Sequence, residues 1–255
     1  MADKAKILAV AGKGGVGKTS LAATLVRRLV EHYPDKRILA IDADPAVGLS
    51  TCLGVNVSLT LDDIRTAIIK QVEEGNRTEA ISMVGDSRFR ILDALVEEKG
   101  FAFLAIGRPE AEGCYCSINT YLKFVITELA EQFDYVVIDG EAGLEQINRR
   151  VMERVTHLLL VSDQSRKGTQ VAASIKAVAD ELVMYEHVGA AVNRVTDPEL
   201  NQFIEIPGVE FITFIETDRH HAVNDIQGKS VFELPEDSAV YRGAEEILGR
   251  FGLVQ

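Results

Sequence analysis

The residues best suited to chemistry stand near the N-terminus, in the segment Gly12-Lys-Gly-Gly-Val-Gly-Lys18-Thr19. It fits the pattern G-x-x-x-x-G-K-[ST], in which glycines let backbone N–H groups wrap around phosphate oxygens. In this pattern the lysine reaches the β- and γ-phosphates and the Thr19 hydroxyl ligates Mg²⁺. We predict a site for ATP or ADP with Mg²⁺, formed by Gly12, Lys13, Gly14, Gly15, Val16, Gly17, Lys18, Thr19 and Ser20.

Three aspartates could complete such a site, because phosphate chemistry needs a carboxylate near Mg²⁺ and a group that orients the attacking water. Asp42 and Asp44 follow an apolar run and are two residues apart, so they share a direction if the strand continues. Asp139 directly follows the apolar run YVVI. Each of the three could instead be a helix N-cap or a turn residue.

Two cysteines form the tripeptide Cys114-Tyr-Cys116. In an extended segment their side chains point the same way and can hold one soft or borderline metal ion. Two thiolates do not complete a tetrahedral site, but a two-fold axis through the pair would supply four. Two incidental small residues or a labile disulfide are the alternatives, and Cys52 is expected to be a packed core residue.

Alternating short and long patterns indicate the elements that must position these residues. Short apolar runs predict buried strands over residues 6–10, 37–41, 135–138, 158–161 and 188–192. Amphipathic patterns predict helices over residues 18–32, 118–132, 168–184 and 237–251. Residues 59–74 also resemble a helix, residues 89–92, 101–106 and 211–215 resemble strands, and 107–116 resemble a loop. The alternation predicts an α/β fold with a mostly parallel sheet flanked by helices, as one domain over residues 1–255.

Composition indicates which kind of ligand and which cellular compartment suit this predicted site. The 255 residues carry a net charge of −12, but residues 1–56 hold eight Lys/Arg and five Asp/Glu, a net of +3. A positive segment in an acidic protein suggests a small anionic ligand and disfavours nucleic acid. Three cysteines cannot form a disulfide framework, and there is no long apolar run or signal-peptide pattern. We expect a cytoplasmic protein with no nucleic-acid or membrane partner.

The loop KGGVGKT and the segment Asp42-Ala-Asp-Pro together resemble the deviant Walker A ATPases of the MinD/ParA type. That family includes the partition and division-site ATPases, the nitrogenase iron protein and the arsenite-pump ATPase, within the SIMIBI P-loop NTPases. The resemblance implies an ATP-bound homodimer in which Lys13 contacts the nucleotide of the facing subunit. It further implies that Lys13 and Lys18 assist catalysis and that Asp44 orients the water. The remaining implied residues are Asp42 near Mg²⁺, Asp139 at the Walker B position, Gly143 at switch II, and Asn193 with Arg194 at the adenine.

The Cys-Tyr-Cys tripeptide, about 70 residues after DxDP, and the following DGEAGLE together resemble the CooC/AcsF ATPases. These ATPases insert nickel into carbon monoxide dehydrogenase and acetyl-CoA synthase. The resemblance implies that Cys114 and Cys116 of two subunits share Ni²⁺ or Zn²⁺, and that the partner is such a nickel enzyme. Two alternatives stay open: an ATP-gated electron donor similar to the nitrogenase iron protein, and a partition or positioning ATPase of the ParA/MinD type.

Overall fold

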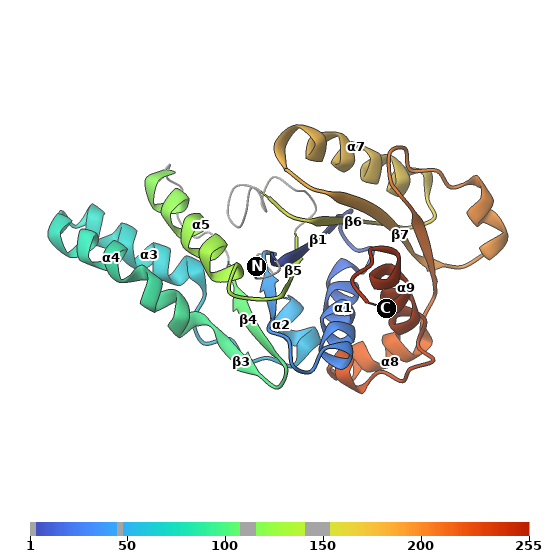
Figure 1. Cartoon of the computed structure of the whole chain (residues 1–255), viewed down its shortest axis with the longest axis horizontal. Helices are drawn as coiled ribbons and strands as arrows, with labels where there is room; N and C mark the ends of the chain where they lie inside the picture. Colours follow the sequence, from blue (N-terminus) through green and yellow to red (C-terminus); the bar gives the residue numbers. More distant parts are fainter. Residues whose placement is uncertain (1–3, 45–47, 108–115, 141–153, 255) are drawn as a thin grey trace.

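The computed structural model describes residues 4–44, 48–107, 116–140 and 154–254. Helices and strands alternate through most of this chain (Figure 1). In order, the elements are β1 (Lys6–Gly12), α1 (Lys18–His32), β2 (Ile38–Asp42), α2 (Gly48–Leu53), α3 (Leu61–Glu73), α4 (Arg77–Ala94), β3 (Val96–Glu98), β4 (Phe101–Ala105), α5 (Cys116–Ala130), β5 (Tyr135–Asp139), β6 (His157–Ser162), α7 (Arg166–Leu182), β7 (His187–Val195), η1 (Pro198–Phe203), β8 (Ile212–Glu216), α8 (Arg219–Ile226), η2 (Val231–Glu233) and α9 (Ala239–Arg250).

The described strands form one eight-stranded sheet in the order β3-β4-β2-β5-β1-β6-β7-β8. Every neighbouring pair is parallel except β3 and β4, which form an antiparallel edge. The central strands β5 and β6 are buried along their whole length, as expected for a parallel sheet covered on both faces. Because parallel strands place their carboxyl ends at one edge, the segments after β1, β2, β5 and β7 are brought together there.

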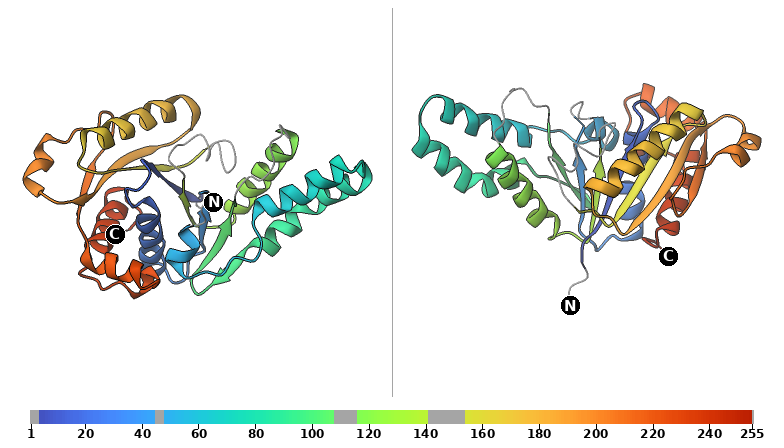
Figure 2. Two further views of the ribbon diagram at one scale, coloured as in Figure 1. Left: turned by 180° about the vertical axis from the view of Figure 1, so that it is seen from behind. Right: turned by 90° about the horizontal axis from the view of Figure 1, so that it is seen from above.

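Helices cover both faces of the sheet (Figure 2). Alternate residues of β1 face opposite layers: Leu8 and Val10 pack with α1 and α9, whereas Ala9 and Ala11 pack with α5 and α7. Helix α1 buries Leu21, Leu25 and Leu29, which recur every four residues and so form one apolar face. The β1–α1 unit that carries the glycine-rich loop is therefore anchored at the centre of the molecule.

The structure confirms the predicted α/β class with its mostly parallel sheet flanked by helices, and the first helix has the predicted bounds. The strand predicted over residues 89–92 is wrong, because these residues lie inside α4. Their four-residue apolar run resembles a strand locally. Ile91 instead continues a helical series of buried residues with Ala80, Ser87 and Ala94, while Phe89 and Leu92 are exposed.

Helices α3 and α4 form a hairpin that projects from the sheet beyond its β3–β4 edge (Figures 1 and 2). Helix α3 begins with a capping box, in which Thr60 accepts a hydrogen bond from the Asp63 N–H and Asp63 accepts one from the Thr60 N–H. The Asp62 N–H donates to the Ile106 carbonyl after β4, which ties the base of the hairpin to the sheet. We call this α3–α4 hairpin the arm.

Candidate functional site

The glycine-rich loop connects β1 to α1 and leaves the first turn of that helix open. Gly17, the N-cap residue of α1, has φ 90° and makes no side-chain cap, so the first N–H groups of the helix are available to an anion. Gly12 pairs with Val161 across the sheet, and a Cβ there would lie 2.1 Å from the Val161 carbonyl oxygen. The glycines therefore permit both the tight turn and the close approach of two strands.

Two lysines of the loop are already held in place. Lys18 is buried, and its Nζ donates to the Lys13 carbonyl oxygen at 3.3 Å, so its ammonium group folds back over the loop. Lys13 forms an ion pair with Asp163, with 3.0 Å between Nζ and Oδ2. Although burial acts to raise the pKa of Asp163, hydrogen bonds from Ser165 and the charge of Lys13 hold it below its usual value. Asp163, just after β6, is a residue that sequence analysis missed; its only signal is a carboxylate two residues after the apolar run that ends at Val161.

Asp42 and Asp139 are register partners on the adjacent strands β2 and β5, and both are fully buried. Asp42 accepts hydrogen bonds from the backbone N–H groups of Asp44 (3.1 Å) and Leu49 (2.9 Å), which fixes the start of the chain between β2 and α2. Burial raises the pKa of Asp42 to about 6, and these hydrogen bonds oppose the shift. Asp42 thus supports the backbone around Asp44.

Asp139 has a different environment. Within the described part of the chain, neither of its carboxylate oxygens takes part in a hydrogen bond. Burial raises its pKa to about 7; Asp42 and Asp44 add to the shift, whereas Thr19 and Lys18 oppose it. A buried carboxylate without a hydrogen-bond partner is costly, and a divalent cation would satisfy it. Asp139 and the neighbouring Thr19 hydroxyl therefore fit Mg²⁺, which would neutralise phosphate charge when bound.

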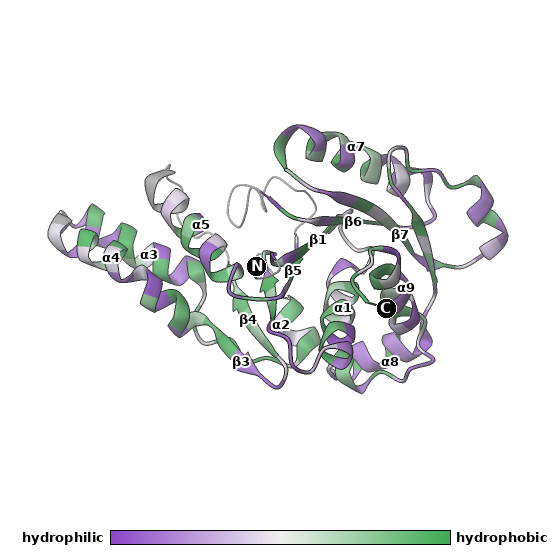
Figure 3. Ribbon diagram, in the orientation of Figure 1, coloured by the Kyte–Doolittle hydropathy of each residue, from purple (hydrophilic) through white to green (hydrophobic). Residues whose placement is uncertain are grey.

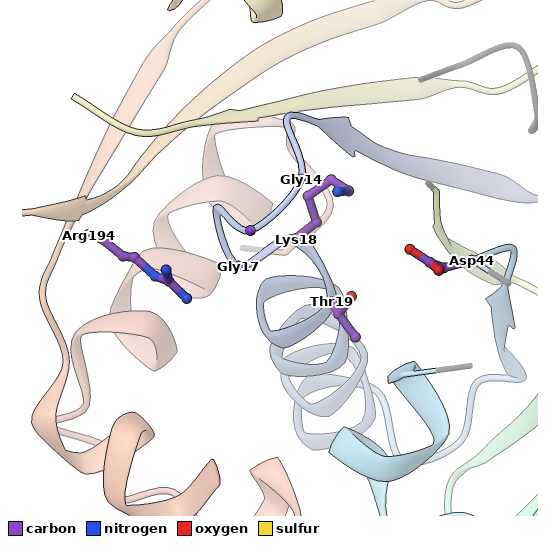
Figure 4. Close-up of a pocket in the computed structure, with 7 residues that line it drawn as sticks. Gly14, Gly17, Lys18, Thr19, Asp44 and Arg194 are labelled. Carbon is purple, nitrogen blue, oxygen red and sulfur yellow. The ribbon is translucent and has the colours of Figure 1, made fainter. Parts of the chain in front are cut away.

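A single open pocket unites much of the predicted site (Figure 4). Thr19 and Lys18 lie between Asp44 on one side and Arg194 on the other (Figure 4). The lining residues are Gly14, Gly15, Gly17, Lys18, Thr19, Asp44 and Arg194. The tertiary structure thus brings the loop, the residue after β2 and the end of β7 together, although they are up to 180 positions apart.

Asn193 supports the loop from β7. Its buried side-chain amide donates to the Val16 carbonyl oxygen at 2.9 Å, and its Oδ1 accepts from the Arg194 N–H at 2.9 Å. Both ends of the amide are therefore engaged within the chain. Arg194 has φ 59°, the one positive value among the described non-glycine residues, and this turn directs its side chain into the pocket.

The other predicted site residues do not line this pocket, and some lie outside the residues that the structure describes. Cys114 and Gly143 lie outside the residues that the structure describes, and Cys116 is described only as the first residue of α5. Within the described ranges, no group of three or more His, Cys, Asp or Glu side chains could hold a metal ion. Cys52 is partly buried, and burial raises the pKa of its thiol to about 11. The same ranges contain no helix long and apolar enough to span a membrane.

Comparisons with known proteins agree with this geometry. Residues 5–185 match the model of a family described as AAA domain. An uncharacterized ATP-binding protein of Methanocaldococcus jannaschii is 37% identical over 246 residues, which cover 94% of this chain and 96% of that protein. The carbon monoxide dehydrogenase accessory protein CooC of Rhodospirillum rubrum is 30% identical over 187 residues, 69% of each chain.

Among solved structures, the septum site-determining protein MinD of Pyrococcus horikoshii, complexed with Mg-ADP, has a TM-score of 0.68 and 20% sequence identity, with 98% of each chain covered. This similarity identifies the fold, and the family match together with the M. jannaschii relative identifies the group of proteins. The glycine-rich loop with its two lysines joins β1 to α1, and Asp42 and Asp139 are the last residues of β2 and β5. The chain belongs to the MinD/ParA-type P-loop ATPases.

Proposed function

We propose that this ATPase is a metal-delivery factor that binds Ni²⁺ between two subunits and supports nickel insertion into carbon monoxide dehydrogenase or acetyl-CoA synthase. The observation that carries the proposal is the position of Cys116 at the first residue of α5. Helix α5 follows β4, whose last residue Ala105 is the register partner of Asp42. Strand β4 therefore ends at the same edge of the sheet as β1, where the phosphate-binding loop begins, and α5 is the next described element along the chain.

Sequence similarity supports the same proposal. The protein CooC of R. rubrum is named as an accessory protein of carbon monoxide dehydrogenase, and this chain is 30% identical to it. A Cys-x-Cys pair can supply two of the four thiolates of a tetrahedral site, and a second copy of the chain would supply the other two. Homodimer formation is accordingly part of the proposal.

In the proposed cycle, the residues of the nucleotide site have separate roles. Backbone N–H groups of the loop and Lys18 bind the phosphates, and Thr19 with Asp139 would hold Mg²⁺. Asp44 orients the attacking water, and Lys13 leaves Asp163 to contact the nucleotide of the facing subunit. Binding of ATP can change metal affinity only as far as the two nucleotide states differ in the geometry of the dimer.

The test is metal stoichiometry measured by elemental analysis on the full-length chain, loaded with Ni²⁺ and separated by size. We expect roughly one nickel per two chains in the dimer, the ratio that a shared four-thiolate site requires. Cys114→Ser and Cys116→Ser should each abolish this binding. Cys52→Ser is the matched control and should keep it, because Cys52 lies on α2, outside the Cys-x-Cys pair, and is partly buried. Undiminished nickel binding by both the Cys114→Ser and the Cys116→Ser variant would refute the assigned ligands.

The same preparation separates the rival functions. Iron and sulfide in anaerobically purified protein would favour an electron-transfer role. ATPase activity stimulated by DNA or lipid, with no response to nickel, would favour a partition or positioning role. Asp44→Ala, expected to bind ATP without hydrolysing it, should retain nickel in the presence of ATP if hydrolysis drives metal release.

A further inference from the structure

The arm carries exposed apolar side chains far from the nucleotide pocket. On α4, Ile81 is 72%, Phe89 69% and Leu92 49% exposed, and Phe124 on α5 is 55% exposed. Large exposed apolar groups are individually common, but a contiguous set on neighbouring helices marks an interaction surface. Hydrophobic residues recur along both helices in Figure 3.

The spacing of these residues places them on one surface. Ile81, Arg88 and Leu92 are separated by seven and four residues, so they share a face of α4, and Phe89 borders it. Phe124 and Glu128 are four apart and share a face of α5. Arg88 and Glu128 form an ion pair at 2.8 Å, which joins the two faces. We call Ile81, Phe89, Leu92 and Phe124 the arm patch.

The centre of the arm patch contains a gap. Gly85 lies on α4 between Ile81 and Phe89, one helical turn from each, and a Cβ there would meet nothing within 4 Å. Large side chains around a glycine form a hole of the kind that receives a knob from a facing helix. The patch is therefore shaped for a helix laid along α4.

A row of acidic side chains borders the patch. Glu79, Asp86 and Asp93 are spaced by seven residues, so they lie along one side of α4, and all three are exposed. None of the three forms an ion pair with any residue that the structure describes. Arg88, on the other side, is already paired with Glu128. Arg90 lies on the same side, four residues after Asp86 and three before Asp93, so this side of α4 carries three acidic side chains and one basic one, a net of −2.

We propose that the arm patch is the docking site for a basic amphipathic helix of a partner protein. The apolar face of that helix would lie over Ile81, Phe89, Leu92 and Phe124, with its Lys or Arg residues beside the acidic row. Helix-in-groove recognition uses this combination, in which apolar anchors give affinity and flanking charges set orientation. The proposal is independent of the nickel proposal, because no residue of the pocket contributes to it.

Charge excludes the other occupants of this surface. An antiparallel two-fold pairing of two arms would set one acidic row against the other. A parallel pairing would need a basic row opposite the acidic one, but Arg88 is paired with Glu128 and Arg90 lies within the acidic side. An anionic membrane would be repelled by Glu79, Asp86 and Asp93.

The experiment titrates the full-length chain against two fluorescent peptides of about 18 residues, the length of α4. Both peptides have the same leucine face, but one carries lysines and the other glutamates along one side. We expect the lysine peptide to bind at micromolar concentration and the glutamate peptide to bind at least tenfold more weakly. The double variant Phe89→Ser/Leu92→Ser should bind the lysine peptide about tenfold more weakly, or weaker still. Unchanged ATPase activity of each variant verifies its fold.

A matched pair of charge variants tests specificity, since a basic peptide could bind any acidic protein. Glu79→Lys, Asp86→Lys and Asp93→Lys together should reduce binding at least tenfold. The control, with Glu199→Lys, Glu205→Lys and Glu236→Lys, changes the net charge equally at exposed sites elsewhere and should bind as the unmodified chain does. Equal losses in the two triple variants would overturn the proposal. So would a dimer that dissociates on Phe89→Ser, or Phe89-dependent sedimentation with phosphatidylcholine–phosphatidylglycerol vesicles.

Discussion

Asn193 holds the nucleotide loop in shape with one side-chain amide. Because its Nδ2 donates to the buried Val16 carbonyl oxygen, Asn193→Ala leaves that carbonyl without a partner. We expect a loss of roughly 1–2 kcal/mol in the free energy of unfolding and weaker binding of ADP. Thermal unfolding and titration with a fluorescent ADP analogue measure the two effects.

Asn201→Ala is the control for this loss, since Asn201 in η1 accepts its hydrogen bond from Gln164 and not from the nucleotide loop. If Asn193→Ala bound ADP as tightly as the unmodified chain, Asn193 would have no role in positioning the loop. A larger loss for ADP than for GDP would indicate that Asn193 also contacts the base.

Asp139 is predicted to destabilise the nucleotide-free protein. Its pKa is about 7 in the folded chain and near 3.8 when unfolded, so ionisation costs folding free energy as pH rises from about 4 to 7. Asp139→Asn should therefore raise the free energy of unfolding at pH 8 by on the order of 2 kcal/mol without Mg²⁺. Denaturant unfolding between pH 5 and 8 measures the difference, which should shrink toward pH 5.

Asp134→Asn is a control for which the opposite change in stability is expected. The Asp134 carboxylate accepts hydrogen bonds from the Arg37 N–H and Lys36, and the Arg37 bond holds its pKa below the usual value. Its replacement should lower stability at neutral pH rather than raise it. The Asp139 interpretation fails if Asp139→Asn destabilises the nucleotide-free chain at pH 8.

At the scale of elements, two helices each contain a glycine in a different environment. In α4 a Cβ on Gly85 would enter open space, whereas in α7 a Cβ on Gly168 would lie 2.2 Å from Asp163 Oδ1. Gly85→Ala should stabilise the chain by about 0.5–1 kcal/mol, because alanine loses less backbone entropy in a helix. Gly168→Ala should destabilise it and displace Asp163 from Lys13.

Thermal unfolding of the two alanine variants checks this contrast directly. Both changes add one methyl group to a helix, so intrinsic propensity alone predicts the same sign for both. Equal stabilisation would show that α7 can move away from Asp163 at little cost.

At the scale of the whole molecule, His157 joins the sheet to the C-terminal end of the chain. It is buried in β6, stacks on His187 with ring centroids 5.1 Å apart, and contacts Phe251 edge-on at 5.1 Å. Burial lowers its pKa to about 4, and the charges of His187 and Lys6 add to the shift. The folded state therefore favours neutral His157, and this stability is lost as pH falls from about 6.5 to 4.

His157→Phe should flatten the pH dependence of stability between pH 4 and 6.5, where we expect the unmodified chain to lose about 2 kcal/mol. At pH 7 the variant should be less stable, since it lacks the 2.7 Å contact between His157 Nδ1 and the Thr156 hydroxyl. Urea unfolding at five pH values measures the slope. An unaltered slope would assign the acid sensitivity to other groups.

Sequence alone predicts the phosphate-binding loop, the α/β class and most of the central elements. These features are local: a glycine pattern, an apolar run or a 3.6-residue period is written in consecutive residues. It also identified Asp42 and Asp139, the last residues of β2 and β5, because each directly follows an apolar run. It could not identify Asp163 as the partner of Lys13, since 150 positions separate them.

Which residues become neighbours and which stay exposed depends on the tertiary structure. Residues 89–92 resemble a strand in isolation, but Ile91 is buried on the same helical face as Ala80, Ser87 and Ala94, as part of α4. Burial of this face leaves Phe89 and Leu92 exposed. The physical reason is that a side chain's environment depends on long-range packing, which overrides the local preference of a four-residue segment.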